Sequence, residues 1–317
     1  MGNTQPRRWQ VAAPLTEPAR DTSRVELAAS HLSHGSPAGR CSWFHEVMET
    51  TPATADAVDV WPPAYRGKAL VKVLAWLVTE RLAGQDAWVT WHMDKQQGPD
   101  SIGRMLEGLG WTEFSRRREL RMTHLRGRPP ATAELPQAAE FSARIGATDL
   151  VFEADYGVFS PRSVDDGTAL LAEVALAEKP VQTVADIGVG YGPLAIALVR
   201  GGVATDAVAT DIDSVALWLA RRNAVRNGVT MTVTCDPDPL AVPPTALTVC
   251  NVPTHIDAAQ SRALMSGLIT RSRSGRLLIV VHRSLEGRYA AHLKNAGLDI
   301  ERHPGPAHTV LAVTGGE

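Results

Sequence analysis

The C-terminal half of the chain alternates short apolar runs with longer amphipathic stretches, as strands and helices do when they follow one another. Six strands are predicted there, over residues 181–187, 207–211, 231–235, 246–252, 276–282 and 308–314. Because helical segments separate these strands, the pattern predicts an α/β domain with a parallel, doubly wound sheet. Such sheets bind ligands at the carboxyl ends of their strands, so functional residues are expected there.

The N-terminal half carries the same alternation but has no glycine loop of the cofactor type. Strands are expected over residues 57–61 and 87–91, helices over 69–78 and 102–109, and one or two strands over 112–125. These elements predict a second α/β domain that serves recognition or stability and binds no cofactor.

The segments without periodicity indicate the domain boundaries. Residues 1–40 are rich in Pro, Arg, Ser and Ala, and we interpret them as a flexible arm. Prolines exclude helix and weaken strands, so Pro129, Pro130 and Pro136 indicate a linker. The expected order is an arm over 1–40, a recognition domain over 41–128, a linker over 129–140 and a catalytic domain over 141–317.

Length and composition agree with two domains and limit the class of protein. A chain of 317 residues with 44% hydrophobic content can bury two cores. It has no apolar run of about 18 residues and no apolar signal core near its start, so we expect a cytoplasmic protein without a membrane segment. Cys41, Cys235 and Cys250 have no metal-binding spacing, and the last two are interpreted as small buried hydrophobes. No metal is implied, and a monomer is expected.

A glycine-rich loop joins the first predicted strand of the C-terminal half to a helix. The loop begins at Asp186, carries Gly188, Gly190 and Gly192, and leads into Pro193. Glycines adopt positive φ and let the backbone approach a ligand closely, as a nucleoside-binding turn requires. The chain is therefore predicted to be an enzyme that uses a nucleoside cofactor.

The residues around the glycines favour one cofactor over another. A dinucleotide site has the spacing Gly-x-Gly-x-x-Gly, which places a pyrophosphate on the helix N-terminus. Here Pro193 removes one of the amides that a pyrophosphate would use, and Asp186 would repel phosphate. A carboxylate suits the ammonium group of a methionine moiety, so the loop predicts S-adenosylmethionine, with NAD as the alternative.

Three acids follow the glycine loop at the ends of predicted strands. Asp211 lies 19 residues after Gly192, close to the spacing of a ribose-hydroxyl acceptor. Asp213 belongs either to the same site or to the N-terminus of the following helix as its cap. Asp236 is placed to reach an adenine amino group, or else serves as a carboxylate in the turn after its strand.

The chain has a formal net charge of −2, but its arginines are clustered. The first cluster comprises Arg116, Arg117, Arg118 and Arg121, with Arg126 and Arg128 close by. Two further groups comprise Arg221, Arg222 and Arg226, and Arg271, Arg273 and Arg276. Such clusters predict contact with RNA phosphates. The alternative is that the arginines are solvated and serve solubility.

Several segments together resemble the RsmC/RlmG-type ribosomal RNA guanine-N2 methyltransferases. They are the segment from Gly157 to Ser160 with Asp165 and Gly167, the glycine loop, Asp211 with Asp213, and the segment from Asn251 to His255. The resemblance implies two tandem Rossmann-like domains. The N-terminal one is degenerate, and the C-terminal one is a seven-stranded doubly wound sheet that binds S-adenosylmethionine, with Phe159 in the cofactor site.

The family carries Asn-Pro-Pro-Phe-His where this chain has Asn251, Val252, Pro253, Thr254 and His255. By resemblance, the Asn251 side chain and the Val252 carbonyl accept hydrogen bonds from the exocyclic amino group of the target base. Pro253 completes the motif, and His255 is expected either to contact the base or to be an ordinary loop histidine. Thr254 cannot stack on a base, so another aromatic, Phe159 or Tyr191, is expected to replace the missing ring, or the target is a different base.

These observations predict an S-adenosylmethionine-dependent methyltransferase that modifies a base of ribosomal RNA, with guanine N2 of the small subunit as the expected target. Its partner would be ribosomal RNA or a ribosomal subunit. A resistance methyltransferase with another target base, a small-molecule methyltransferase of secondary metabolism, and a non-catalytic assembly factor are the alternatives.

Overall fold

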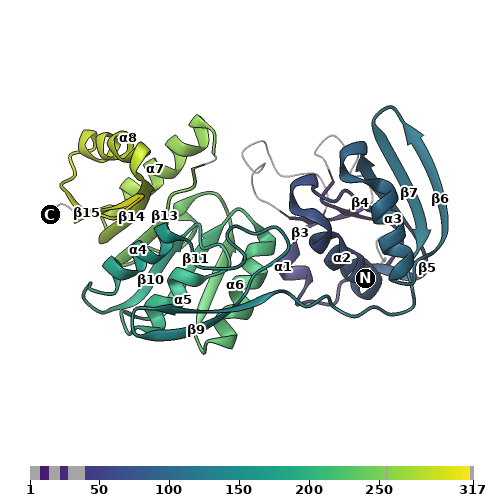
Figure 1. Cartoon of the computed structure of the whole chain (residues 1–317), viewed down its shortest axis with the longest axis horizontal. Helices are drawn as coiled ribbons and strands as arrows, with labels where there is room; N and C mark the ends of the chain where they lie inside the picture. The colour runs from purple at the N-terminus through teal and green to yellow at the C-terminus, as the bar shows by residue number, and fades with distance from the viewer. Residues whose placement is uncertain (1–7, 14–21, 28–39, 255, 315–317) are drawn as a thin grey trace, which may run out of the picture. The chain divides into compact units, whose positions relative to one another are not determined.

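The computed structural model describes residues 8–13, 22–27, 40–254 and 256–314. Internal contacts divide the chain into two units (Figure 1). The N-terminal unit comprises Met1–Ala138 and Asp155–Val158, and the C-terminal unit comprises Ala139–Ala154 and Phe159–Glu317. The division at residue 138 lies inside the predicted linker, whose residues 129–139 form neither helix nor strand.

The C-terminal unit is built on a seven-stranded sheet with the strand order β12-β11-β10-β13-β14-β16-β15 (Figure 1). The strands are β10 (Val181–Ile187), β11 (Ala204–Asp211), β12 (Met231–Cys235), β13 (Leu247–Asn251), β14 (Arg276–His282), β15 (Ile300–Pro304) and β16 (His308–Val313). All six strands predicted from the sequence are present, and β10, β12 and β14 have the predicted bounds.

The prediction of a wholly parallel sheet is wrong at one edge. Strands β10 to β14 are parallel, but β16 runs antiparallel to both β14 and β15. Only three residues separate Pro304 from His308, and the backbone amide of Gly305 donates to the carbonyl of His308 at 2.8 Å. A connection this short can join only antiparallel strands, because a parallel crossover needs a dozen or more residues.

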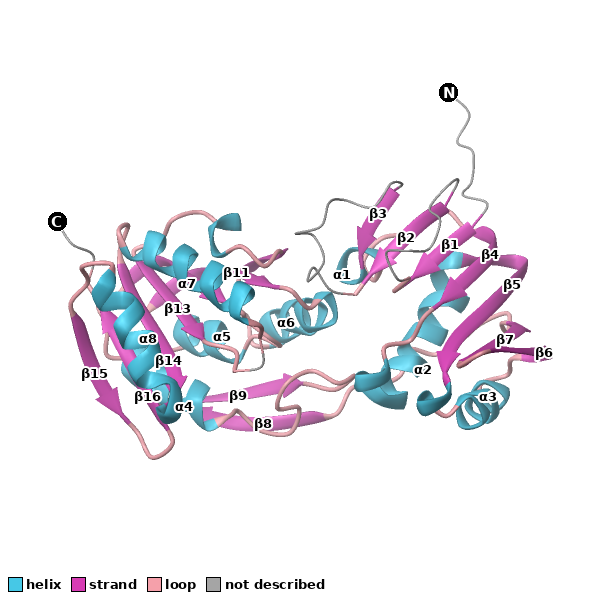
Figure 2. Ribbon diagram, turned by 90° about the horizontal axis from the view of Figure 1, so that it is seen from above, coloured by secondary structure: helices cyan, strands magenta, loops and turns pink. Residues whose placement is uncertain are grey.

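Helices cover both faces of this sheet, as a doubly wound fold requires (Figure 2). They are α4 (Asp166–Ala175), α5 (Pro193–Arg200), α6 (Ser214–Arg226), α7 (Ala258–Ser272) and α8 (Arg283–Asn295). Helices α4, α5 and α6 lie side by side. Helices α7 and α8 bury Met265, Leu268 and Leu293 against the opposite face, where alternate residues of β14 such as Ile279 and Val281 point.

The sheet of the N-terminal unit has the strand order β3-β2-β1-β4-β5-β7-β6. The strands are β1 (Arg8–Val11), β2 (Thr22–Glu26), β3 (Arg40–Trp43), β4 (Ala55–Val60), β5 (Ala83–Asp94), β6 (Thr112–Glu119) and β7 (Met122–Arg128). The helices are α1 (Phe44–Val47), α2 (Gly67–Leu77), which continues as a π-helical turn (Val78–Leu82), and α3 (Pro99–Gly108). Numbered from its first strand, the sheet has the same order as that of the C-terminal unit, which confirms the predicted tandem of related domains.

The prediction of a flexible arm over residues 1–40 is wrong for strands β1 and β2 (Figure 2). Trp9, Val11 and Val25 are at most 4% exposed, so these segments belong to the core of the unit. The sequence pattern hides them because buried polar residues interrupt it. Arg24 is 1% exposed, and its guanidinium donates to the carbonyl of Ala13 at 2.8 Å. A buried arginine with satisfied donors is compatible with a central strand, although periodicity alone predicts a surface position.

A hairpin that the sequence analysis missed packs against α6 in the C-terminal unit. It consists of β8 (Glu140–Ile145) and β9 (Thr148–Glu153). Glu153 is 5% exposed and accepts two hydrogen bonds from Arg222, at 2.7 and 2.9 Å, and another from Arg226. The guanidinium groups of Arg222 and Arg226 thus fix this hairpin, and RNA contact by these two arginines stays a prediction.

The replacement Glu153→Ala is expected to lower the free energy of unfolding by about 2 kcal/mol, since hydrogen bonds to charged groups contribute about 1.5–3 kcal/mol each and the arginines here are partly exposed. Its arginine partners hold the pKa of the Glu153 carboxyl below its usual 4.5, although burial opposes this shift. The stabilisation is thus present above pH 4.5 and lost as the pH falls through the folded pKa. Denaturant unfolding at pH 7 and in acid measures both effects.

Glu140→Ala is the matched control, because Glu140 pairs with Arg226 at 2.8 Å but is 52% exposed. A loss of less than about 0.5 kcal/mol is expected there. Equal losses for the two variants would contradict the structural role of Glu153.

Among the residues that the structure describes, no helix combines the length and apolar character needed to span a membrane.

Candidate active site

The glycine loop connects β10 to α5 at the carboxyl end of β10. Gly188, Gly190 and Gly192 have φ values of +79°, +57° and +96°, as predicted from the sequence. A Cβ atom added at Gly188 or Gly190 would meet nothing within 4 Å, whereas one at Gly192 would lie 3.0 Å from Ile196. Gly188 and Gly190 therefore border open space that a ligand can approach, and Gly192 packs against its helix.

Asp186 is the last residue but one of β10, and its carboxyl is 2% exposed. Its Oδ2 accepts a hydrogen bond from the backbone amide of Ala195, in the first turn of α5, at 3.1 Å. Burial, with a smaller contribution from the neighbouring Asp211, raises the pKa of this carboxyl to about 7. Because Pro193 has no amide and the Ala195 amide is engaged, the helix N-terminus is poorly suited to a pyrophosphate.

Asp211 ends β11 and faces the glycine loop. Its Oδ2 accepts from the backbone amide of Gly190 at 2.8 Å, and its Oδ1 accepts from the amide of Asp213 at 2.8 Å. Each carboxylate oxygen has a second lone pair for a ligand hydroxyl. The geometry therefore fits the predicted ribose-binding role, with the carboxylate oriented in advance by the loop that would lie beneath the nucleoside.

The other two acids are used within the fold. Asp213 caps α6, since its Oδ1 accepts from the amides of Val215 and Ala216 at 2.9 and 3.2 Å. This is the capping alternative from the sequence analysis. Asp236 follows β12, and its Oδ1 accepts from the amide of Asp238 at 2.8 Å. It is half-buried and adjoins Asp211, to whose carbonyl its own amide donates at 3.1 Å.

Asn251 ends β13 and is held by two residues at the start of α4. Its Nδ2 donates to the hydroxyl of Thr168 at 2.9 Å and lies 3.3 Å from both carboxylate oxygens of Asp165. The Thr168 hydroxyl donates to Asp165 Oδ2, so it can only accept from Asn251. These acceptors select the NH₂ end of the amide. The Oδ1 atom of Asn251 is therefore turned away from α4 and available as an acceptor.

Asp165 and Thr168 were not predicted as orienting residues. Asp165 caps α4 by accepting from the amides of Gly167 and Thr168 at 3.0 and 3.2 Å. The sequence signal was an N-cap pattern, which by itself indicates only the start of a helix. Its second role depends on Asn251, which lies 86 residues further along the chain.

The residues after Asn251 explain part of the departure from the family motif. Val252 is 5% exposed, and its backbone amide donates to the carbonyl of Val280 at 3.1 Å, which extends the ladder between β13 and β14. Proline has no such donor, so valine adds a hydrogen bond at this position. Pro253 and Thr254 are exposed. His255 lies outside the described residues.

The structure distinguishes the two aromatic residues that were considered as replacements for the missing ring. Tyr191 is 4% exposed and lies edge-on between Phe141 and Phe152, with ring centroids 6.0 and 5.7 Å apart. Its ring faces are therefore covered. Phe159 is 73% exposed and remains available for stacking on a planar ligand.

The arginines of the first cluster lie on the exposed strand β6 and its turn. Arg116 pairs with Asp100, and Arg117 pairs with Glu119. Within the described ranges no acid pairs with Arg118 or Arg121.

Of the third group, Arg271 is 4% exposed and donates to the carbonyls of Pro239 and Val242 at 3.1 and 3.0 Å. Arg276 pairs with Glu178 and Glu301, both at 2.9 Å. The prediction of RNA contact is therefore wrong for Arg271, whose guanidinium is buried inside the unit, and it stays a prediction for Arg276.

Cys235 and Cys250 are free and buried, which confirms their interpretation as small core residues. Burial raises the pKa of the Cys250 thiol far above its usual range, so the thiol stays protonated. Over the described part of the chain, no three His, Cys, Asp or Glu side chains form a group that could hold a metal ion.

Comparison with known proteins connects this geometry to an enzyme class. Residues 149–298 match the model of the methyltransferase small domain family. The match confirms the predicted class, an S-adenosylmethionine-dependent methyltransferase, and the family segment contains the glycine loop, Asp211 and Asn251.

Two sequence relatives match parts of the chain. The ribosomal RNA small subunit methyltransferase C of Chromohalobacter salexigens is 37% identical over 126 residues, which cover 38% of this chain and 36% of that protein. The uncharacterized protein YbxB of Bacillus subtilis is 26% identical over 148 residues, which cover 45% of this chain and 74% of that protein.

The similarity to one solved structure extends over both units. That structure is the T. thermophilus 16S rRNA N2 G1207 methyltransferase RsmC in complex with AdoMet and guanosine. The two share a TM-score of 0.74 and 21% identity, over 99% of this chain and 89% of that chain. At this identity the similarity establishes a common fold, including the tandem of Rossmann-like sheets.

Proposed function

We propose that this chain methylates a base of ribosomal RNA in the cytoplasm, and that the target is the exocyclic N2 amino group of a guanine in the small subunit. The single observation that carries the proposal is the orientation of Asn251, whose NH₂ group is held by Asp165 and Thr168. An acceptor turned toward the ligand side is what an exocyclic amino group needs, because that group donates two hydrogen bonds. The matched small-subunit methyltransferases support the same substrate class.

In this proposal the cofactor site is formed by three parts of the C-terminal unit. Gly188 and Gly190 provide open backbone, Asp211 accepts from the ribose hydroxyls, and Asp186 offers a carboxylate to the ammonium group. Asp213 and Asp236 lie beside Asp211. Phe159 provides an exposed aromatic ring for the cofactor. When bound, S-adenosylmethionine supplies an electrophilic methyl carbon on a sulfonium.

The residues of the β13 end aim the nucleophile. Asn251 Oδ1 accepts one N–H of the base, and the Val252 carbonyl accepts the other, which directs the nitrogen lone pair at the methyl carbon. The new N–C bond forms as the S–C bond breaks, and the extra proton then leaves the nitrogen for water. Pro253 fixes the chain after Val252, and His255 contacts the base. Alignment supplies most of the rate, since the step needs no strong base.

On the RNA side, the proposal assigns phosphate contacts to Arg118 and Arg121, which are exposed on β6 and its turn. Arg116 and Arg117 could join them only by leaving Asp100 and Glu119. Exchange of a surface ion pair for a phosphate costs little, because exposed pairs contribute about 0–1 kcal/mol.

The test is methyl transfer from labelled S-adenosylmethionine to small ribosomal subunits and to their naked RNA, followed by mapping of the mark by mass spectrometry. The proposal expects N2-methylguanosine at one position of the small-subunit RNA. A mark on another base would retain the RNA substrate and correct the target. Absence of any mark on RNA, with the cofactor bound, would exclude the proposed substrate class.

The buried carboxyl of Asp186 makes cofactor affinity depend on pH. Its pKa of about 7 means that it is protonated in the free protein below pH 7, whereas binding an ammonium group favours the carboxylate. Affinity for S-adenosylmethionine is therefore expected to rise with pH, by up to about tenfold per unit, and to level off above 7. Calorimetry between about pH 5.5 and 7.5 measures this, and an α-amino group, with a pKa of about 7.7–8.0, stays mostly protonated over that range.

Asp186→Asn is the matched variant, because it keeps the shape and removes the titration. Its affinity should be weaker at pH 7.5 and independent of pH. A wild-type affinity that does not change over this range would contradict the pairing of Asp186 with the ammonium group.

A further inference from the structure

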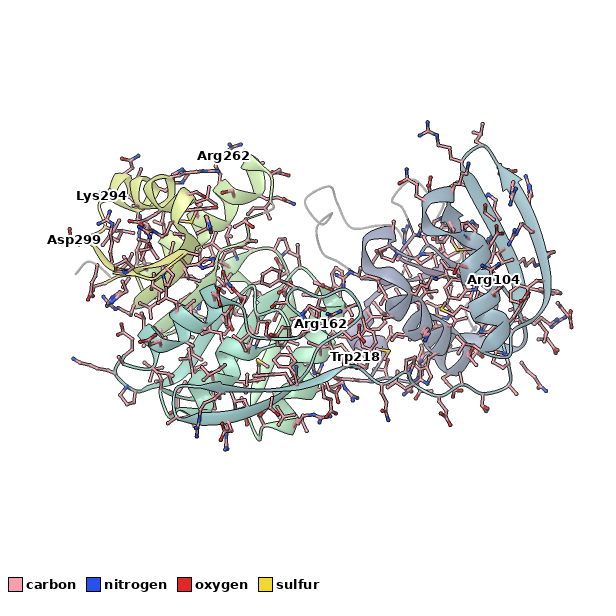
Figure 3. The ribbon with its side chains drawn as sticks, viewed as in Figure 1. Arg104, Arg162, Trp218, Arg262, Lys294 and Asp299 are labelled. Carbon is pink, nitrogen blue, oxygen red and sulfur yellow. The ribbon has the colours of Figure 1, made fainter. Side chains whose placement is uncertain are left out.

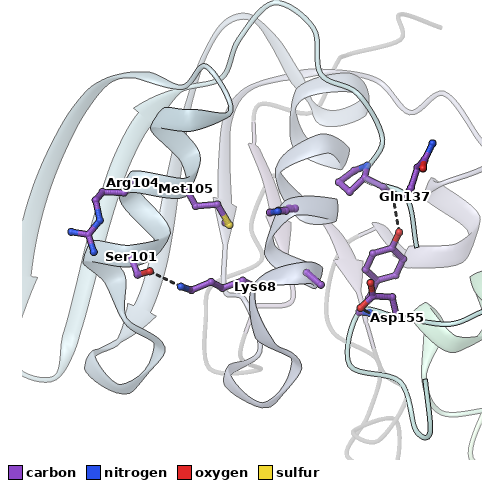
Figure 4. Close-up of a pocket in the computed structure, with 10 residues that line it drawn as sticks. Lys68, Ser101, Arg104, Met105, Gln137 and Asp155 are labelled. Atoms are coloured by element: carbon purple, nitrogen blue, oxygen red, sulfur yellow. Dashed lines mark hydrogen bonds between the residues drawn. The ribbon is translucent and has the colours of Figure 1, made fainter. Parts of the chain in front are cut away.

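The N-terminal unit contains a pocket of about 720 Å³ that the sequence analysis did not predict (Figure 4). All of its lining residues belong to this unit, including Asp155 and Tyr156 from the segment that returns to it. Its walls come from two neighbouring helices, α2 with Lys68 and Lys72, and α3 with Ser101 and Arg104. It is therefore a feature of one folded unit and separate from the glycine loop.

The pocket carries an excess of positive charge. Lys68, Lys72 and Arg104 line it, with Asp155 as the single acid among the lining residues. Lys68 and Lys72 are four residues apart on α2, so their ammonium groups leave the helix on the same face, about one turn apart. Two cations at that spacing can bind one phosphate group from two sides.

The charges of the pocket are not neutralised within the fold. Lys68 Nζ donates to the hydroxyl of Ser101 at 2.6 Å, which holds the ammonium over the pocket without cancelling its charge (Figure 4). Among the described residues, none of Lys68, Lys72 and Arg104 pairs with a carboxylate. This contrasts with Arg116 and Arg117 on β6, which both pair with acids.

The wall opposite the lysines is held in place. The Tyr156 side chain is 1% exposed, and its hydroxyl donates to the carbonyl of Pro136 at 2.7 Å (Figure 4). A Cβ atom at the next residue, Gly157, would lie 2.7 Å from Cα of Arg66, so this segment packs tightly against the unit. Asp155 Oδ1 accepts a hydrogen bond from the backbone amide of Tyr156 at 2.6 Å, so one carboxylate oxygen is engaged by the backbone. The pocket is thus built from fixed elements.

We propose that this pocket binds the phosphate backbone of the RNA substrate, with Lys68 and Lys72 on a phosphate and Arg104 at the rim. In Figure 4 the Arg104 side chain extends from α3 away from Lys68, where it would meet the adjoining nucleotide. The inference rests on the proposed function, because it gives the N-terminal unit a part in holding the same RNA. It adds a contact on α2 and α3 to those assigned above to Arg118 and Arg121.

The test compares the full-length chain with the variant Lys68→Gln/Lys72→Gln in binding a fluorescein-labelled single-stranded RNA oligonucleotide at several salt concentrations. Loss of two phosphate contacts is expected to weaken binding by about tenfold and to lower the slope of log K against log salt by about 1.4, since each contact to single strands contributes about 0.7. The variant Lys68→Arg/Lys72→Arg should retain the wild-type slope.

The matched control is Lys179→Gln/Lys294→Gln, which removes two exposed lysines of the C-terminal unit (Figure 3 labels Lys294 on α8). It should leave RNA affinity and slope unchanged. All variants should keep the thermal midpoint and the affinity for S-adenosylmethionine. An unchanged slope in the Lys68/Lys72 variant, or absence of RNA binding by the wild type, would overturn the pocket proposal. Absence of methyl transfer by a wild type that binds RNA through Lys68 and Lys72 would instead overturn the proposed function.

Discussion

Asn251→Ala is expected to lower the turnover of methyl transfer by about 100- to 1000-fold while S-adenosylmethionine still binds. Removal of one positioned group that aligns a reacting atom has effects of this size. The variant loses Oδ1, which the contacts of the NH₂ group with Asp165 and Thr168 leave free as the proposed acceptor. Single-turnover kinetics with labelled cofactor measures the chemical step, and calorimetry measures cofactor affinity.

Two further variants test whether orientation is the reason. Asp165→Ala removes the carboxylate but leaves the Thr168 hydroxyl near Asn251, so a smaller loss of turnover is expected, together with weaker capping of α4. Asn295→Ala, at the exposed end of α8, should change nothing. A turnover for Asn251→Ala within about threefold of the wild type would remove Asn251 from the reaction.

Asp211→Ala is expected to weaken the affinity for S-adenosylmethionine by roughly 100-fold, since hydrogen bonds to a charged acceptor contribute about 1.5–3 kcal/mol each. The replacement also frees the backbone amide of Gly190, which donates to Oδ2 at 2.8 Å, so the glycine loop loses a fixed contact. Calorimetry gives the dissociation constant directly, and turnover at saturating cofactor should recover most of the wild-type value.

The control on the same strand is Asp206→Ala, because Asp206 lies on β11 five positions before Asp211, away from the carboxyl end. Its cofactor affinity should equal that of the wild type. If the wild type, Asp211→Ala and Asp206→Ala bound S-adenosylmethionine equally well, the nucleoside would lie elsewhere. If both variants lost affinity, the cause would be damage to β11 itself.

The fold of the C-terminal unit was largely predictable because its strands are continuous apolar runs between clear helices. Strand β15, with the sequence Ile-Glu-Arg-His-Pro, escaped prediction because its side chains are mostly polar and exposed at the sheet edge. Strands β1 and β2 were not predicted because each is short and contains a buried polar residue, Gln10 and Arg24 respectively. Only tertiary partners make such a residue stable in a buried strand. Local pattern cannot reveal partners that lie far along the chain.

The candidate site was predictable wherever the backbone imposes a local requirement. Positive φ at Gly188, Gly190 and Gly192 follows from the turn itself, and the end of β11 positions Asp211. The arginine contacts were less predictable, since Arg222, Arg226, Arg271 and Arg276 differ from surface arginines only in the acids and carbonyls that surround them. The orientation of Asn251 likewise depends on a contact across 86 residues.

The most direct test of the account is a crystal structure of this chain with S-adenosylhomocysteine and guanosine. We expect the ribose hydroxyls within hydrogen-bond distance of Asp211, the nucleoside over Gly188 and Gly190, and the guanine amino group on Asn251 Oδ1 with its nitrogen facing the sulfur. A nucleoside bound away from the glycine loop, or a guanine whose amino group points away from Asn251, would contradict the account.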